Sequence, residues 1–212
     1  MNLIERISDI ARSHFESARS SHRWDHTQRV CRMALHLGEQ EGADRDIVAL
    51  AALLHDIGRT EEDRSQGRIR HAERGADMAR KILAGEGLED NKIGKIVHCI
   101  ATHRFRDNKQ PETPEAKVLF DADKLDSIGA VGIARAFLFA GEVGAMLHDK
   151  NVDPENSDPY SEEDTAYREY LVKLRYIKDQ MLTRSGLELA KERHRFMTDF
   201  FERLNREVDG EI

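Results

Sequence analysis

The sequence has little cysteine, proline or aromatic residue content. Its 212 residues include 2 cysteines, 4 prolines and 14 glycines, and aromatic residues make up 6%. Cys31 and Cys99 are far apart and form no CxxC motif, which predicts reduced thiols in the core rather than a disulfide or a zinc site. So little proline and glycine excludes collagen-like and proline-rich low-complexity structure.

The sequence also lacks a basic excess and a long hydrophobic run. Lys and Arg number 33 against 40 Asp and Glu, which gives a net charge of −7. This balance argues against a nucleic-acid partner and against an anionic membrane surface. The most apolar runs, residues 47–54 and 129–141, are too short to span a bilayer. Residues 1–6 do not resemble a secretory signal, so we expect a cytoplasmic protein.

Apolar residues recur with a helical period along nearly the whole chain, and no segment alternates as a strand does. We therefore predict an all-α, single-domain fold of about eight or nine helices over residues 1–212. The expected parts are a core (20–140), an acidic surface loop (149–165) and a C-terminal helical pair (166–207). The expected helices cover residues 2–17, 25–42, 45–54, 71–84, 90–103, 113–126, 128–140, 167–181 and 186–207.

Ten histidines are many for an acidic chain of this size, and the direction in which each points is informative. His26 shares a helix face with Val30 and Leu37, so it is expected to point into the core. His55 and Asp56 directly follow an apolar run and precede Gly58. That position would bury an imidazole and a carboxylate side by side at the end of a core helix.

Asp123 is the fourth inward-facing candidate, because it falls within the apolar arc of Leu119 and Phe120. Burying Asp56 and Asp123 unpaired would cost several kcal/mol, and no Lys or Arg shares their apolar faces. A divalent cation would satisfy both carboxylates. For any one of these residues alone, a hydrogen-bonded core role is the better interpretation; the four together favour a metal site.

Two His and two Asp suit Mn²⁺, Fe²⁺, Ni²⁺, Co²⁺ or Zn²⁺ better than Ca²⁺, and Mg²⁺ is a further candidate. The expected cofactor is one such ion. His71 and His103 also lie on apolar helical stripes. They could contact substrate or transfer protons, act as core or cap residues, or hold a second metal, and we rank these roles in that order. Arg59 and Lys124 each follow a predicted ligand shortly and could bind phosphate, although exposed cations are commoner.

The chain resembles the HD superfamily of metal-dependent phosphohydrolases, in particular a single-domain bacterial and archaeal subgroup, over roughly residues 20–207. The resemblance rests on DHTQRV around His26, ALLHDIGR around His55 and Asp56, DADKLDSIGA around Asp123, HAERGA around His71 and IATHRF around His103. It implies that His26, His55, Asp56 and Asp123 coordinate a divalent metal. Members cleave phosphomonoesters or phosphoanhydrides of nucleotides.

The chain departs from this family at one place. Nucleotidases and ppGpp hydrolases of the superfamily often have acids three and four residues after the HD pair, where this chain has Arg59 and Thr60. Glu61 and Glu62 come slightly later. We therefore assign no general acid, and a ppGpp hydrolase is disfavoured.

The resemblance predicts hydrolysis of a nucleotide phosphate, as a nucleoside triphosphate pyrophosphohydrolase or a nucleotidase. Asp56, His71 and His103 would be the catalytic residues, and Arg59 and Lys124 the substrate contacts. A di-iron oxygenase is an alternative that needs both His71 and His103 as ligands. A non-catalytic metal- or nucleotide-binding module is another. The expected partner is a small-molecule phosphate, and the C-terminal helices could cover the site or form a homodimer surface.

Overall fold

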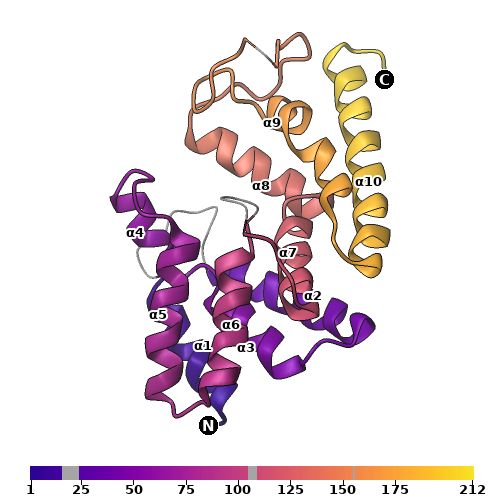
Figure 1. The fold of residues 1–212 in the computed structure, drawn as a ribbon. Helices are drawn as coiled ribbons and strands as arrows, with labels where there is room; N and C mark the ends of the chain where they lie inside the picture. Colours follow the sequence, from indigo (N-terminus) through magenta and orange to yellow (C-terminus); the bar gives the residue numbers. More distant parts are fainter. Residues whose placement is uncertain (16–23, 105–108, 155) are drawn as a thin grey trace. The chain divides into compact units, whose positions relative to one another are not determined.

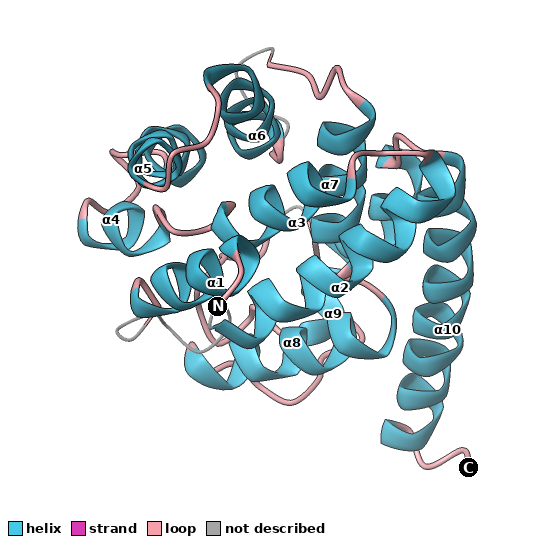
Figure 2. Ribbon diagram, turned by 90° about the horizontal axis from the view of Figure 1, so that it is seen from below, coloured by secondary structure: helices cyan, strands magenta, loops and turns pink. Residues whose placement is uncertain are grey.

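The computed structural model describes residues 1–15, 24–104, 109–154 and 156–212 (Figure 1). These residues form ten α-helices and one 3-10 helix, and no strand occurs among them (Figure 2). The all-α prediction is confirmed. Over the same ranges, no helix is both long and apolar enough to cross a membrane.

The chain divides into two compact units, Met1–Asp123 and Lys124–Ile212. The expectation of one domain over residues 1–212 stays a prediction. The helices that begin in the first unit are α1 (Leu3–Ser13), α2 (Trp24–Glu41), α3 (Arg45–Leu54), α4 (Arg59–Arg64), α5 (His71–Gly85), α6 (Asp90–Thr102) and α7 (Pro114–Leu125). The second unit contains α8 (Gly129–Glu142), α9 (Ala166–Val172), the 3-10 helix η2 (Leu174–Gln180) and α10 (Arg184–Val208).

Helix α3 is the centre of the first unit. It packs against α1, α2 and α6, and every residue from Ile47 to Leu54 is buried. A helix that is apolar on all sides belongs in a core, as its sequence predicts. Its start is also as expected, because the Asp44 carboxylate accepts hydrogen bonds from the backbone N–H groups of Asp46 and Ile47. Gly42, with a φ of +68°, ends the preceding helix.

Helix α4 lies between the helices expected over residues 45–54 and 71–84, where the sequence predicts none. The helix buries none of its residues, so it leaves no apolar period to detect. Its charges fit the helix dipole instead, with Glu61 and Glu62 in the first turn and Arg64 in the last. This short helix packs against α5.

The predicted helix over 167–181 is divided in the structure into α9 and η2. Leu174 and Ile177 are both buried and lie three residues apart, which matches the three-residue period of a 3-10 helix. The described residues contain more helices than the eight or nine expected, because α4 was not predicted and one predicted helix is divided into α9 and η2. The helical pair that the sequence predicts at the C-terminus is thus a short α-helix, a 3-10 helix and the long α10.

The acidic loop is anchored by one buried arginine of the second unit. Arg168 Nη1 donates to Asp164 Oδ1 at 2.9 Å, and its Nε donates to Ser157 Oγ at 2.6 Å. Both ends of the ion pair are nearly fully buried. The end of this loop therefore belongs to the packed structure, although its composition predicts a surface segment.

The end of α7 is held by two arginines within the second unit. Arg193 donates to the carbonyl oxygen of Leu125, and Arg135 donates to the Asp126 carboxylate at 2.8 Å. The next turn needs a glycine, because Gly129 has a φ of +74° and a Cβ there would lie 2.9 Å from Arg193 Cγ. These contacts fix where α7 stops.

Both cysteines are free thiols, as predicted. Cys99 is buried in α6, and burial raises the pKa of its thiol to about 12. Cys31 is partly exposed, and burial also raises the pKa of its thiol. Neither has the lowered pKa of a reactive cysteine.

Candidate metal centre

The His55–Asp56 pair lies where α3 ends, at the centre of the first unit. His55 caps the helix at its C-terminus, and both side chains are at most 2% exposed. The prediction that this pair is buried at the end of a core helix is confirmed. One imidazole and one carboxylate are therefore buried in the interior, directly after an apolar helix.

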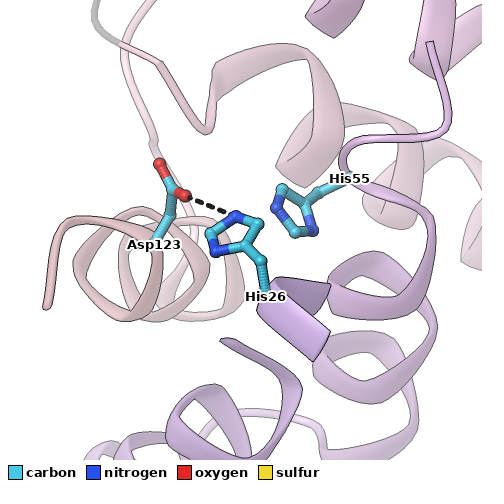
Figure 3. Close-up of side chains that lie close together, drawn as sticks. All are labelled: His26, His55 and Asp123. Atoms are coloured by element: carbon cyan, nitrogen blue, oxygen red, sulfur yellow. Dashed lines mark ion pairs between the residues drawn. The ribbon is translucent and has the colours of Figure 1, made fainter. Parts of the chain in front are cut away.

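The first group of side chains that could hold a metal ion consists of His26, His55 and Asp123, and we call it triad A. His26 comes from the first turn of α2 and Asp123 from the last turns of α7. One ligand atom of each lies within 4.8 Å of the others. Figure 3 shows the three side chains converging, with His26 Nε2 3.4 Å from Asp123 Oδ1.

The second group consists of Asp56, His71 and His103, and we call it triad B. His71 is the first residue of α5, and His103 directly follows α6. Their Nε2 atoms lie 3.2 Å apart, and His71 Nε2 lies 3.3 Å from Asp56 Oδ1. All three side chains are 1% exposed. The structure thus brings together all six side chains that the sequence singles out as ligands or catalytic residues.

Asp56 of triad B also lies close to triad A. Its Oδ2 is 3.7 Å from His26 Nε2 and 3.8 Å from His55 Nε2. Its Oδ1 faces the other way, toward His71 and His103. A carboxylate that presents one oxygen to each group could contact an ion in either triad, or join two.

Backbone carbonyl groups fix the tautomers of two histidines. His55 Nδ1 lies 2.8 Å from the Ala52 oxygen, and His103 Nδ1 lies 2.7 Å from the Ile100 oxygen. A carbonyl oxygen only accepts, so each Nδ1 carries the proton and donates. The lone pair of a neutral ring is then on Nε2, which faces the cluster. This is the usual arrangement in metal sites, where the second ring nitrogen is held by a carbonyl or carboxylate.

The Glu62 carboxylate fixes the tautomer of His71. Its Oε2 lies 2.5 Å from His71 Nδ1, so Nδ1 donates and Nε2 is left with its lone pair. The Nε2 lone pairs of His71 and His103 then face each other at 3.2 Å, where neither can donate. A cation between them resolves this conflict. His71 and His103 would then hold the ion through these two nitrogens.

Two further observations fit a metal. Nε2 of His55 is buried and has no hydrogen-bond partner among the described residues. Burial lowers the pKa of His71 to about 3, in spite of Asp56, and lowers that of His103 well below its usual value. Both rings are therefore neutral at pH 7, which is the form that binds metals. The donor set, nitrogens with carboxylate oxygens, suits a divalent transition metal.

The two predicted phosphate contacts differ in their surroundings. Arg59 opens α4 and is 14% exposed; its Nη1 lies 3.0 Å from Glu62 and its Nη2 3.5 Å from Asp56. Burial lowers the pKa of Arg59, but Asp56, Glu62 and Asp123 outweigh it and the net shift is upward. Lys124 lies in the last turn of α7, where its charge complements the helix dipole.

Glu62 and Arg104 are the neighbours of the cluster that sequence reasoning did not single out for a role. Glu62 follows Asp56 by six residues, in a segment without apolar period. Arg104 directly follows His103, and its Nη1 lies 3.4 Å from His71 Nδ1 and 4.0 Å from Glu62. Only the packing of α4 and α6 against α5 reveals these contacts.

Comparison with known proteins gives consistent results. The HD domain family matches residues 23–128. YpgQ of Bacillus subtilis (strain 168) is 37% identical over 210 residues, covering 97% of this chain and 94% of YpgQ. A crystal structure of YpgQ in complex with ADP superposes with a TM-score of 0.76 at 34% identity, over 98% of each chain. An HD-superfamily hydrolase from Bacillus thuringiensis also has a TM-score of 0.76, at 32% identity, over 97% of this chain and 96% of the other.

Proposed function

Because the chain belongs to the HD-domain family, we propose that it is a metal-dependent phosphohydrolase that acts on a nucleotide. The observation that carries the proposal is the cluster of four histidine Nε2 atoms around Asp56, with Asp123 beside it. A nucleotide substrate is supported by the ADP held by YpgQ in its crystal structure. The concrete forms we favour are a nucleoside triphosphate pyrophosphohydrolase and a nucleotidase.

The metal would be held by His26, His55, Asp56 and Asp123, as the family resemblance implies. When bound, a divalent ion supplies Lewis-acid chemistry and lowers the pKa of a coordinated water toward neutrality. The chain's own part is to present imidazole nitrogens and carboxylate oxygens that already lie close together.

Positive charge beside the cluster is the second requirement for attack on a phosphate. Arg59 is proposed to supply it. Its Nη1 and Nη2 face Glu62 and Asp56, whereas its Nε is buried and has no hydrogen-bond partner among the described residues. Lys124 stays a proposed second contact. Asp56, His71 and His103 stay the proposed catalytic residues, and the two histidines would act as ligands of a second ion.

The proposal is tested by assaying metal-stripped protein with added Mn²⁺, Mg²⁺, Co²⁺ or Ni²⁺ against nucleoside mono-, di- and triphosphates. We expect turnover that requires added metal and stops with a chelator. Release of pyrophosphate would identify a pyrophosphohydrolase, and release of orthophosphate from a monophosphate would identify a nucleotidase. No turnover of any nucleotide with any of the metals would refute the proposal.

Triad B supports a second ion, and we propose that the chain binds two. Calorimetric titration of metal-free protein with Mn²⁺ is expected to give two equivalents per chain, and His71→Ala is expected to give one. His36→Ala is the matched control, because His36 is exposed, lies within hydrogen-bond distance of Gln40 and belongs to neither triad. Binding of only one Mn²⁺ per unmodified chain would contradict a second ion. Triad B would then act in proton transfer or in substrate contact.

A di-iron oxygenase is the second candidate function. It needs two metal ions, with His71 and His103 among their ligands, and triad B would provide both histidines. The two functions differ in a simple measurement. An oxygenase would require iron and consume O₂, whereas a phosphohydrolase works equally well under anaerobic conditions.

A further inference from the structure

Asp123 is the proposed metal ligand that the surrounding protein encloses least. Its side chain is 18% exposed, whereas those of His26, His55 and Asp56 are at most 2% exposed. The three buried side chains are held in place by the packing around them. Asp123 is less enclosed, so the position of its carboxylate depends more on the backbone of α7, which carries it close to the end of the helix.

The chain just after α7 is fixed by a buried carboxylate three residues beyond Asp123. Asp126 is 5% exposed, and Arg135 Nη1 donates both to its Oδ2 at 2.8 Å and to its backbone oxygen at 3.1 Å. One guanidinium nitrogen thus holds the side chain and the main chain of the same residue. Because a buried carboxylate is costly to leave unpaired, this contact favours a single orientation of the backbone at Asp126.

A second arginine acts on the same end of the helix. Arg193 donates to the carbonyl oxygen of Leu125, one of the last carbonyl groups of α7, which have no N–H partner within the helix. Burial lowers the pKa of Arg193 and the Asp126 carboxylate opposes that shift, so the charge of Asp126 acts on both arginines. Helices α8 and α10, which carry Arg135 and Arg193, pack against each other. We call Asp126, Arg135 and Arg193 the α7 clamp.

The α7 clamp does more than a helix end requires. Gly42, for example, ends α2 through its left-handed backbone, with a φ of +68°. A buried ion pair adds little net stability, because the desolvation of both groups offsets their attraction, and its best-attested use is to select one arrangement. Here the selected arrangement is that of the last turn of α7, which contains Asp123.

We propose that Arg135 and Arg193 are positioning residues for the metal centre: they fix the end of α7 and thereby orient the Asp123 carboxylate toward His26. The proposal rests on the proposed metal-binding role of Asp123. An arginine has no lone pair to offer a metal, so both residues act through the backbone of α7. Asp123 lies less than one helical turn before Asp126, and ligands must be held within about 0.5 Å of their productive positions.

The test is a calorimetric titration of the full chain with Mn²⁺ in a His71→Ala background, where triad B is incomplete and the ion at triad A is titrated alone. Arg135→Gln is expected to raise the Kd for Mn²⁺ by about 10-fold, as replacements of residues that orient ligands do. Arg193→Gln should raise it in the same direction. Arg135→Lys keeps a positive charge beside Asp126 and should recover part of the affinity.

Arg168→Gln is the matched control for a loss of stability. Arg168 also forms a buried ion pair in the second unit, 2.9 Å from Asp164, but it anchors the acidic loop instead of α7. It should lower Tm by about as much as Arg135→Gln does and leave the Kd for Mn²⁺ unchanged. The double variant Arg135→Gln with Asp126→Asn removes both charges of its pair, so it should melt near the unmodified protein and still bind Mn²⁺ more weakly.

The outcomes separate this proposal from the proposed function. If Arg135→Gln and the double variant bind Mn²⁺ as their His71→Ala parent does, or if Arg168→Gln weakens binding equally, the positioning role is wrong, whether or not nucleotides are hydrolysed. Failure of the parent to bind Mn²⁺ would also overturn it. If the α7 clamp variants weaken Mn²⁺ binding but the unmodified chain hydrolyses no nucleotide, the positioning role stands and the proposed function falls.

Discussion

Replacement of Asp56 by asparagine is expected to lower kcat/KM for the proposed nucleotide substrate by about 10³-fold or more. Asp56 belongs to triad B and also approaches triad A, with Oδ1 3.3 Å from His71 Nε2 and Oδ2 3.7 Å from His26 Nε2. Asparagine keeps the size of the side chain but removes its charge and replaces an acceptor oxygen with a donor. Binding of Mn²⁺, measured by calorimetry, should be lost together with activity.

The stability of the metal-free variant provides the control for folding. Asp56 is 2% exposed, and a neutral amide is less costly to bury than a carboxylate, so melting of Asp56→Asn without metal should be unchanged or higher. Asp46→Asn is the matched variant at the opposite end of α3, where Asp46 is exposed and pairs with Lys92. Its activity should stay within about twofold of the unmodified protein. Full metal affinity in Asp56→Asn would contradict the assignment of Asp56 as a ligand.

Gly58→Ala is expected to destabilise the protein by about 3 kcal/mol, although it adds only one methyl group. A Cβ at Gly58 would lie 2.5 Å from the carbonyl oxygen of His71 and 2.7 Å from the backbone nitrogen of Gly75. Both atoms are backbone of α5, so no side chain can turn away to make room. The start of α5 would have to move, and with it His71.

Thermal unfolding tests this prediction, with an expected fall in Tm of roughly 6 to 12 °C. The same displacement should weaken metal binding at triad B, because His71 would leave its position 3.3 Å from Asp56. Gly94→Ala is the matched control in the middle of α6, where nothing lies within 4 Å of the added Cβ. It should stabilise the protein by about 0.5 to 1 kcal/mol, because alanine favours the helix. Equal stability of Gly58→Ala and the unmodified protein would show that the contact with α5 is looser than in the structure.

Local chemistry explains why much of the fold could be predicted from the sequence. The cap at Asp44, the stop at Gly42 and the apolar run before His55 each act within one helix. The inward direction of His26 and Asp56 follows from their neighbours in the same segment. These features can be predicted without knowing which helices pack against each other.

Each feature that the sequence did not reveal has a physical cause. Helix α4 buries no residue, so its sequence carries charge but no period. The 3-10 helix after Val172 uses a three-residue spacing that, over two buried residues, cannot be distinguished from an α-helical face. Arg168 is a charged residue that would be expected at the surface. It is buried because Asp164 and Ser157, which lie in the acidic loop, accept hydrogen bonds from its guanidinium group.

The sequence by itself determined the helical class, the inward-facing histidines and acids, and the suspicion of a metal. Only the tertiary structure decided how those residues are grouped. His71 and His103 lie 32 residues apart in the chain, and the packing of α5 on α6 brings their Nε2 atoms to 3.2 Å. The packing of α4 against α5 brings Glu62 to His71, and the packing of α6 against α5 brings Arg104 beside them. Helical periodicity determines which way a side chain points, whereas the contacts between helices determine what it meets there.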